Sequence, residues 1–220
     1  PILLDVYQAF TERFKIPHVI DGYGLTECPC VCQNPIDGIK KIGSMGLPAK
    51  HPDPSIRFTE MKIVDDDQEL PPNKVGELVL RSPVLMKGYF KDPEPTSMAM
   101  RGGWFRTGDY CYRDEDGYYF FVDRKKDIIR RKGENISSVE LETVINTHPK
   151  VSESAVIAVP SSLSEDEVKA FVVLKDGEYL SPEELIEWCM DRLADFKMPR
   201  FVEYRKNLPR TPSQRIAKYI

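Results

Sequence analysis

The chain has 220 residues, of which 41% are hydrophobic and 30% are charged, and its net charge is -4. This length can bury at least one core and can hold two domains. The acidic balance argues against a dedicated binder of nucleic acid or of anionic membranes, because such proteins need a basic face. No apolar run approaches the roughly 20 residues of a membrane-spanning helix, and no signal peptide is recognisable. We expect a cytoplasmic protein and, because residue 1 is Pro1 and not Met, a piece of a longer chain.

The region before residue 126 is expected to be mostly β-structure after one amphipathic helix. Residues 2–15 predict that helix, because their apolar side chains recur at helical spacing. An apolar strand running into a glycine turn is expected in residues 18–27, with further strands at 56–65 and 76–82. A loop rich in glycine and proline covers residues 34–54, and a short helix is expected at 96–101. The helical positions are Leu3, Val6, Tyr7, Phe10 and Phe14.

Residues 103–123 predict a β-hairpin with two aromatic-rich strands. Asp116-Gly117 lies between them, and this dipeptide is typical of a tight hairpin turn.

The five cysteines are too few and too unevenly placed for a disulfide scaffold. Cys28, Cys30 and Cys32 would share one face of an extended segment. We expect reduced thiols that pack beneath a sheet. A metal site is the alternative, although this spacing is not that of C-x-x-C and no histidine is near.

The sequence pattern changes near Asp127. Two capping boxes, Ser137 with Glu140 and Ser181 with Glu184, predict helices at 139–148 and 183–196. Short apolar strands are expected at 153–162, 168–177 and 200–206. The fold class is therefore α+β, with a mostly β region at 1–125 and a compact α+β unit at 126–220. The charged run at 123–127 is expected to be a short hinge, because it lacks the composition of a flexible linker.

Residues Tyr23-Gly24-Leu25-Thr26-Glu27 form the first candidate binding segment. A strand that ends in a glycine turn exposes backbone N–H groups together with these side chains. Thr26 could bind a phosphate, Glu27 a divalent cation, and Tyr23 could stack on a base. A polar loop that closes a strand explains the same five residues.

Two further candidates lie around the predicted hairpin. The Asp109 carboxylate in Thr107-Gly108-Asp109 could accept hydrogen bonds from both hydroxyls of a ribose, although the tripeptide also suits an ordinary turn. Arg124 has the forked donors that phosphate or ribose oxygens prefer. A solvated charged loop and a nuclear-localisation-like patch are the alternatives, and Asp123 and Asp127 count against the patch because they dilute its positive charge.

The last two candidates lie in the second region. Gly133, in Lys132-Gly133, permits a positive φ or a close ligand approach just before a capped helix, although a simple helix-entry turn needs the same residues. Residues 208–218 form an exposed tail with several cations, and a frayed terminus is the alternative explanation.

The order of these segments is more specific than any one of them. The series YGLTE, GELVLRSPVLMKGYFKDP, GWFRTGD, DGYYFFVDRKKDIIRRKGENISSVELE, FKMPR and LPRTPSQRIAK closely resembles the adenylate-forming superfamily. This superfamily comprises acyl-CoA synthetases, adenylation domains of peptide synthetases and firefly-type luciferases. The resemblance extends from about Asp21 to the end of the chain. FVDRKKDIIRRKGENIS and LPRTPSQRIAKY look most like medium-chain and carnitine/crotonobetaine-type acyl-CoA ligases.

The resemblance implies a two-step reaction that uses ATP, Mg²⁺ and coenzyme A. A small carboxylic acid and ATP give an acyl-adenylate and pyrophosphate, and the acyl group then passes to coenzyme A with release of AMP. Residues 1–125 would be the C-terminal part of the large AMP-binding domain, and residues 126–220 its small mobile C-terminal domain. The chain's partner would be the missing N-terminal part of the same protein, and nothing indicates its oligomeric state.

The resemblance also assigns roles in the first region. Tyr23 and Gly24 would line the junction of the adenine and acyl sites. Thr26 would contact phosphate, Glu27 would hold Mg²⁺, and Asp109 would bind both ribose hydroxyls.

At the boundary of the two regions, Arg124 would reach the ribose and phosphate, and Lys126 falls on the family's hinge position. Rotation about this hinge would bring Lys132 and Gly133 to the site where the coenzyme A arm enters. One departure concerns Gln214-Arg215, where the family has Gly-Lys. Arg215 is the expected catalytic cation, and Lys218, three residues on, is expected to share the role.

The chain also lacks the family's Ser/Thr/Gly-rich phosphate loop, which lies upstream of YGLTE. We therefore expect that these 220 residues alone do not catalyse adenylation. An adenylation domain that loads a carrier-protein thiol is one alternative, although the sequence reaches the family's closing motif, which favours a stand-alone ligase. A non-catalytic nucleotide-binding remnant is the other alternative. A nucleic-acid binder is disfavoured by the net acidity.

Overall fold

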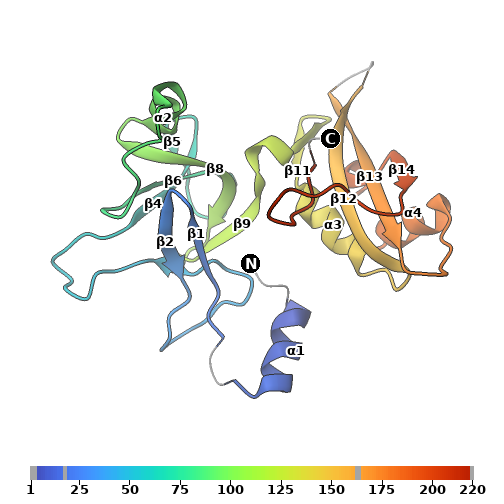
Figure 1. Ribbon diagram of the computed structural model, residues 1–220, viewed down its shortest axis with the longest axis horizontal. Coiled ribbons are helices and arrows are strands. Elements are labelled where there is room, and N and C mark those ends of the chain that lie inside the picture. The colour runs from blue at the N-terminus through green and yellow to red at the C-terminus, as the bar shows by residue number, and fades with distance from the viewer. Residues whose placement is uncertain (1–3, 17–18, 162–164, 219–220) are drawn as a thin grey trace. The chain divides into compact units, whose positions relative to one another are not determined.

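The computed structural model describes residues 4–16, 19–161 and 165–218, and the side chains from residue 6 onward within them (Figure 1). Its contacts divide the chain into two compact units, Pro1–Val122 and Asp123–Ile220. The domain boundary at 125/126 stays a prediction. Leu3, His18 and Ser162, which the expected helix and strands included, lie outside the described residues.

The first unit contains two antiparallel sheets. After α1 (Leu4–Phe14), the smaller sheet has the order β1-β2-β3. The larger sheet has the order β5-β4-β6-β8-β7, with β9 paired to β8. A short helix, α2 (Pro93–Ala99), precedes β7. The strands are β1 (Gly22–Leu25), β2 (Cys28–Gln33), β3 (Leu47–Pro48), β4 (Glu60–Asp65), β5 (Gln68–Glu69), β6 (Gly76–Arg81), β7 (Met100–Arg101), β8 (Trp104–Arg113) and β9 (Tyr119–Arg124).

The larger sheet has one apolar face and one charged face. Met61 pairs with Leu80, and Leu80 with Phe105, and all three belong to the buried core of this unit. The next residues along the strands, Lys62 and Val79, pair on the opposite face. This alternation is the two-residue period of a half-buried strand.

The helix expected at the beginning of the chain is confirmed, whereas the strand expected after it lies elsewhere. The helix is α1, and its apolar side chains Val6, Phe10 and Phe14 are exposed and join no core cluster of the described residues. The described residues 19–21, which precede the glycines, are not in a strand. The strand is Gly22–Leu25 itself, and the turn that follows contains Thr26 and Glu27.

The cysteine prediction was wrong at one position. Cys28 and Cys32 are buried, whereas Cys30 is exposed. The pairing of β1 with β2 shifts register between Tyr23 and Leu25, so alternate residues of β2 no longer share one face. All five cysteines are free, and no three His, Cys, Asp or Glu residues in the described part of the chain are grouped to hold a metal ion.

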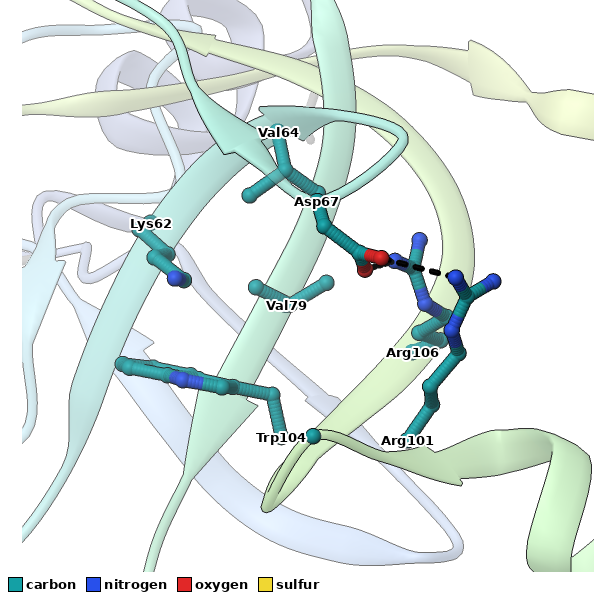
Figure 2. A pocket seen from close by; sticks show the side chains of 8 residues that line it. Lys62, Val64, Asp67, Val79, Arg101, Trp104 and Arg106 are labelled. Carbon is teal, nitrogen blue, oxygen red and sulfur yellow. Dashed lines mark hydrogen bonds and ion pairs between the residues drawn. The ribbon is translucent and has the colours of Figure 1, made fainter.

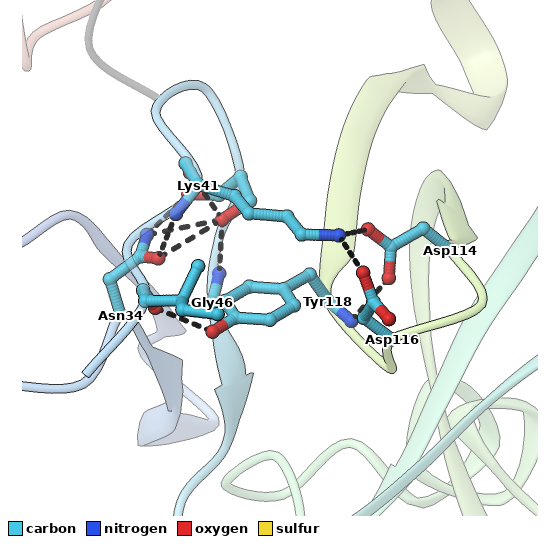
Figure 3. A network of polar contacts seen from close by, with 8 residues as sticks. Asn34, Lys41, Gly46, Asp114, Asp116 and Tyr118 are labelled. Carbon is cyan, nitrogen blue, oxygen red and sulfur yellow. Dashed lines mark hydrogen bonds and ion pairs between the residues drawn. The ribbon is translucent and has the colours of Figure 1, made fainter.

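The predicted hairpin forms, and a polar network fixes its turn (Figure 3). The Lys41 ammonium bridges Asp114 and Asp116, and it lies 4.9 Å from the centre of the Tyr118 ring. The pKa of Lys41 is raised to about 12 by its hydrogen bonds to Asp114 and Asp116. The loop that carries Lys41 is thereby tied to the turn between β8 and β9.

The second unit packs two helices on one sheet. The sheet order is β12-β13-β14, with β13 and β14 parallel, and β10 and β11 form a separate hairpin. Residues of α3, α4 and the sheet make one buried core, and Figure 1 shows the long strands β12 and β13 side by side. The elements are a 3-10 turn (Lys125–Asp127), β10 (Ile129–Arg131), β11 (Glu134–Ile136), α3 (Ser138–Asn146), β12 (Val151–Pro160), β13 (Asp166–Leu174), α4 (Pro182–Met190), a second 3-10 turn (Asp195–Lys197) and β14 (Phe201–Tyr204). The fold is α+β, as the sequence predicts.

The two predicted capping boxes have different outcomes. At α4, the Ser181 and Glu184 side chains cap each other's backbone N–H groups, so this box is confirmed. At α3, Ser137 accepts from the Glu140 N–H, but the Glu140 carboxylate pairs with Lys197 and does not return to the cap. No helix among the described residues is long and apolar enough to cross a membrane.

Candidate functional site

Tyr23 of β1 and Asp109 of β8 meet, although 86 residues separate them. The Tyr23 hydroxyl donates to Asp109 Oδ2 at 2.5 Å. Burial, with the Asp109 charge as the next cause, raises the pKa of Tyr23 far above its ordinary value, so the hydroxyl stays protonated and keeps donating. The pair is partly buried, and the carboxylate is held in one orientation.

Gly108 lies in a β-bulge and not in the turn expected from the sequence. Strand β8 continues through it, while the register with β6 shifts between Glu77 and Val79. Gly108 has φ +69°, which favours glycine. The Thr107 hydroxyl donates to the Leu78 carbonyl at 2.8 Å and accepts from the Asp109 N–H at 3.1 Å. A bulge re-aims the side chain next to it, here the Asp109 carboxylate.

The close approach of two strands explains why residue 24 is a glycine, without any ligand. A Cβ at this position would lie 2.3 Å from the Pro29 carbonyl oxygen on the paired strand β2. Gly24 therefore lets β1 and β2 approach closely, which positions Tyr23 beside it. Thr26 is exposed on the turn that follows.

Glu27 presents a carboxylate at the same turn. Its Oε1 accepts from the Tyr89 hydroxyl at 2.7 Å. Burial and this hydrogen bond raise the pKa of Tyr89 to about 12. Mg²⁺ in nucleotide sites is commonly held by one or two carboxylates together with substrate phosphates. A single carboxylate at an accessible turn fits that donor set, so Glu27 is a suitable ligand for a nucleotide-bound cation.

Arg124 and Lys126 lie in the second unit, Arg124 directly before its first 3-10 turn and Lys126 within that turn. Both side chains are exposed. Asp123, which is buried near the end of β9, links this segment to α3. Its Oδ1 accepts from the Arg124 N–H at 2.7 Å, and its Oδ2 accepts from the Ser138 N–H at 2.6 Å. Asp123 thus fastens the predicted hinge segment to the N-terminus of α3.

Lys132 and Gly133 form the two-residue loop of the β10–β11 hairpin. Arg131 pairs with Glu134, and the two loop residues have φ +54° and +80°. Two positive φ values are typical of a type I′ turn. The Gly133 N–H donates to Glu165 at 2.7 Å, and this hydrogen bond lowers the pKa of Glu165. The loop is therefore exposed but conformationally defined.

The C-terminal tail separates the two candidate cations. Lys218 is largely buried, and its ammonium contacts Glu142 and the Ser138 hydroxyl, both at 2.7 Å. Arg215 is exposed at a turn, and its guanidinium forms no hydrogen bond or ion pair with the described residues. Gln214, next to it, has φ +65°. The geometry favours Lys218 as an anchor of the tail and Arg215 as the cation available to a ligand.

The structure brings Tyr23 and Asp109 together and places Glu27 on the hairpin that carries Tyr23. Gly24 and Thr26 lie on the same hairpin, and the remaining predicted site residues lie in the second unit: Arg124, Lys126, Lys132, Gly133, Arg215 and Lys218. Their roles stay predictions. The sequence reasoning missed Tyr89, Asp123 and Glu142 as partners of site residues. All three lie within motifs that it used, but nothing in the sequence links Glu142 to Lys218.

Two family models match this chain. Residues 1–90 match the AMP-binding enzyme family, and residues 140–215 match the AMP-binding enzyme C-terminal domain.

Curated relatives and solved structures agree with these matches. The long-chain-fatty-acid–CoA ligase of Escherichia coli O6:H1 is 43% identical over 94% of this chain and 36% of its own length. The crotonobetaine/carnitine–CoA ligase of Salmonella arizonae is 37% identical over 96% of this chain and 40% of its own length. This chain thus spans about two fifths of the relatives it matches.

Among solved structures, ATP-bound MatB from Rhodopseudomonas palustris has a TM-score of 0.85 and 32% identity, over 98% of this chain and 42% of MatB. The AMP complex of O-succinylbenzoate coenzyme A synthetase from Bacillus subtilis has a TM-score of 0.86 and 30% identity, over 99% of this chain and 43% of the synthetase. The chain belongs to the adenylate-forming, AMP-binding enzyme family, and it comprises the mostly β end of the large domain followed by the small α+β C-terminal domain.

Proposed function

We propose that the protein to which this chain belongs is an AMP-forming acyl-CoA ligase. In the first step, a carboxylate oxygen attacks the α-phosphorus of ATP, the bond to the β-phosphate oxygen breaks, and pyrophosphate leaves. In the second step, the thiol of coenzyme A attacks the acyl carbon, loses its proton, and AMP leaves with the electrons of the acyl–oxygen bond.

In the first step, this chain's residues bind and orient the nucleotide. Asp109 accepts hydrogen bonds from the ribose hydroxyls through oxygens that the bulge directs, and Tyr23 holds the carboxylate in place. Thr26 contacts phosphate, and Glu27 binds Mg²⁺, which neutralises phosphate charge. Arg215 approaches the carboxylate and α-phosphate. The catalytic contribution is positioning and electrostatic stabilisation.

In the second step, the small unit rotates about the segment that contains Lys126. The exposed Lys132-Gly133 loop then lines the entrance of the coenzyme A arm. A few backbone torsions suffice for such a movement.

One observation supports this proposal above the others. In a chain of this family, the Asp109 carboxylate is oriented by a bulge on one side and by the Tyr23 hydroxyl on the other. Such an arrangement suits the recognition of two neighbouring hydroxyls. The full-length gene product, supplied with ATP, coenzyme A and a panel of carboxylic acids, is expected to form AMP and an acyl-CoA in equal amounts.

Three outcomes of that experiment distinguish the alternatives. AMP binding without any formation of acyl-CoA would support the alternative that the protein is a non-catalytic nucleotide-binding remnant. Acyl transfer to a carrier-protein thiol but not to coenzyme A would support the alternative that it is an adenylation domain that loads a carrier protein. The 220-residue chain alone is expected to release no pyrophosphate, and release from it would contradict the expectation that catalysis needs an upstream phosphate loop.

A further inference from the structure

The charged face of the larger sheet carries a pocket that none of the predicted site residues lines. Its volume is about 340 Å³, within the range of small-molecule sites. Figure 2 shows it between β4, β6 and β8, with Val79 near its centre, Lys62 and Trp104 on one side, and Asp67 with two arginines on the other. The lining residues are Lys62, Val64, Asp67, Val79, Arg101, Gly102, Trp104 and Arg106.

The floor and one wall of the pocket are apolar. Val64 and Val79 are each only 2% exposed, although they point away from the core face of the sheet. The Trp104 indole forms the wall, with Arg81 4.2 Å and Lys62 4.5 Å from its ring centre. A charged side chain over an indole face orders both groups.

Positive charge predominates in the lining, since three cations face one carboxylate. Asp67 uses one oxygen for Arg106 at 2.5 Å and the other for Arg101 at 2.7 Å. Arg106 is also paired with the buried Glu77 at 2.9 Å. The acceptors of the pocket are therefore occupied by these arginines.

Two of the cations keep donors for a further partner. The Lys62 ammonium contacts the Trp104 ring and forms no ion pair with the described residues. Arg101 donates to Asp67 through Nη2, and its Nε and Nη1 make no hydrogen bond within the described part of the chain. A guanidinium has five N–H donors, so Arg101 can bind an additional oxygen.

We propose that this pocket binds a small organic anion. Its carboxylate or phosphate group lies between Lys62 and Arg101, and its apolar body rests on Val79 and the Trp104 ring. An anion is favoured because the free donors are cationic, and an apolar body is favoured because the floor and wall are apolar. The site is separate from Tyr23 and Asp109, so the inference does not depend on the proposed reaction.

The test uses the chain labelled with 5-fluorotryptophan. It has two tryptophans, so fluorine NMR gives two resonances, and a Trp188→Phe variant assigns them. The probes are benzoate, phenyl phosphate, benzyl alcohol and inorganic phosphate. We expect benzoate or phenyl phosphate to shift the Trp104 resonance saturably, with the preferred one identifying the anionic group. We expect benzyl alcohol and inorganic phosphate to bind at least about tenfold more weakly, since benzyl alcohol lacks the anionic group and inorganic phosphate lacks the apolar body.

Two variants of pocket residues and one control variant show whether the probe binds in this pocket. Lys62→Met preserves the apolar stem over Trp104 and should weaken binding of the anionic probe by at least about tenfold. Arg101→Met should have a similar effect, whereas Lys74→Met, on an exposed loop outside the pocket, should have none. Equal affinity for benzyl alcohol and benzoate, unchanged affinity in both pocket variants, or no saturable shift below about 10 mM would overturn the proposal.

Discussion

The candidate residues of the two units are held in different ways. In the first unit, Asp109 is fixed by a bulge, by the Thr107 hydroxyl and by Tyr23. In the second unit, Lys126 and Arg215 are exposed on turns. Tyr23 and Asp109 are thus held within the sheets of the first unit, whereas the Arg215 guanidinium forms no hydrogen bond or ion pair with the described residues.

This difference separates two kinds of substitution. Changes around Tyr23 and Asp109 alter the fold and the proposed binding site together, because the same contacts serve both. Changes at Arg215 are expected to alter the proposed function alone, because its side chain is exposed and its guanidinium forms no hydrogen bond or ion pair with the described residues. Five substitutions, each with a comparison variant, follow in order of decreasing expected effect.

Gly24→Ala should have the largest effect, on the stability of the first unit. The new Cβ would lie 2.3 Å from the Pro29 carbonyl oxygen and 2.8 Å from its carbonyl carbon, and both of these Pro29 atoms belong to the backbone. We expect a loss of about 3 kcal/mol in the free energy of unfolding, because β1 and β2 must separate. Urea unfolding followed by Trp104 fluorescence in a Trp188→Phe background measures it.

Gly22→Ala is the matched control on the same strand. Its Cβ would lie 3.0 Å from the Cys32 carbonyl oxygen, so a much smaller loss is expected. Equal losses in the two variants would show that the close approach at Gly24 does not hold the hairpin together.

Arg215→Ala tests the exposed cation. In the full-length protein we expect adenylation to fall by about 100-fold, because a charge opposite the α-phosphate is lost, while the melting temperature stays unchanged. Arg215→Lys should retain most of the activity. ATP–pyrophosphate exchange and thermal denaturation are the two measurements.

Lys218→Met should lower stability more than adenylation, which is the opposite of the result expected for Arg215→Ala. It leaves Glu142, which is buried beside it, without its cation, so the small unit should lose stability. If Lys218→Met abolishes adenylation at unchanged stability while Arg215→Ala does not, the catalytic cation is Lys218 and our assignment is wrong.

Tyr23→Phe should have a smaller effect on both properties. It removes one hydrogen bond to the Asp109 carboxylate, which is worth about 1.5 kcal/mol. The affinity of the full-length protein for AMP should fall at the same time, because the carboxylate is no longer held. Calorimetric titration with AMP measures this. Tyr112→Phe is the control, since Tyr112 stacks on Phe120 and its hydroxyl donates to none of the described residues; an equal loss in the control would rule out the specific role of Tyr23.

The sequence predicted features that depend on local chemistry. The Asp116-Gly117 turn and the Ser181–Glu184 capping box follow from neighbouring residues, and both form. The family resemblance, carried by motifs in order, is confirmed as well.

Features that depend on distant pairing could not be predicted. The bulge at Gly108 arises from the register between β8 and β6, and the exposure of Cys30 arises from the register between β1 and β2. Likewise, the ion pair of Lys218 with Glu142 joins the C-terminal tail to α3, and these two segments are far apart in the sequence. Local patterns specify turns and caps, whereas register and long-range ion pairs are decided by the assembled fold.

Gln214→Gly should have the smallest effect, and it is expected to stabilise. Gln214 has φ +65°, a conformation that costs a non-glycine residue about 1–2 kcal/mol. Part of the gain is lost because glycine is freer in the unfolded chain, which leaves about 0.5–1 kcal/mol. The tail contributes Leu208 to a buried cluster with Ala155, so this strain is coupled to unfolding of the second unit and Trp188 fluorescence reports it. Ser213→Gly, at a residue without positive φ, should destabilise instead, and a gain in both variants would mean that tail flexibility, not strain at Gln214, limits stability.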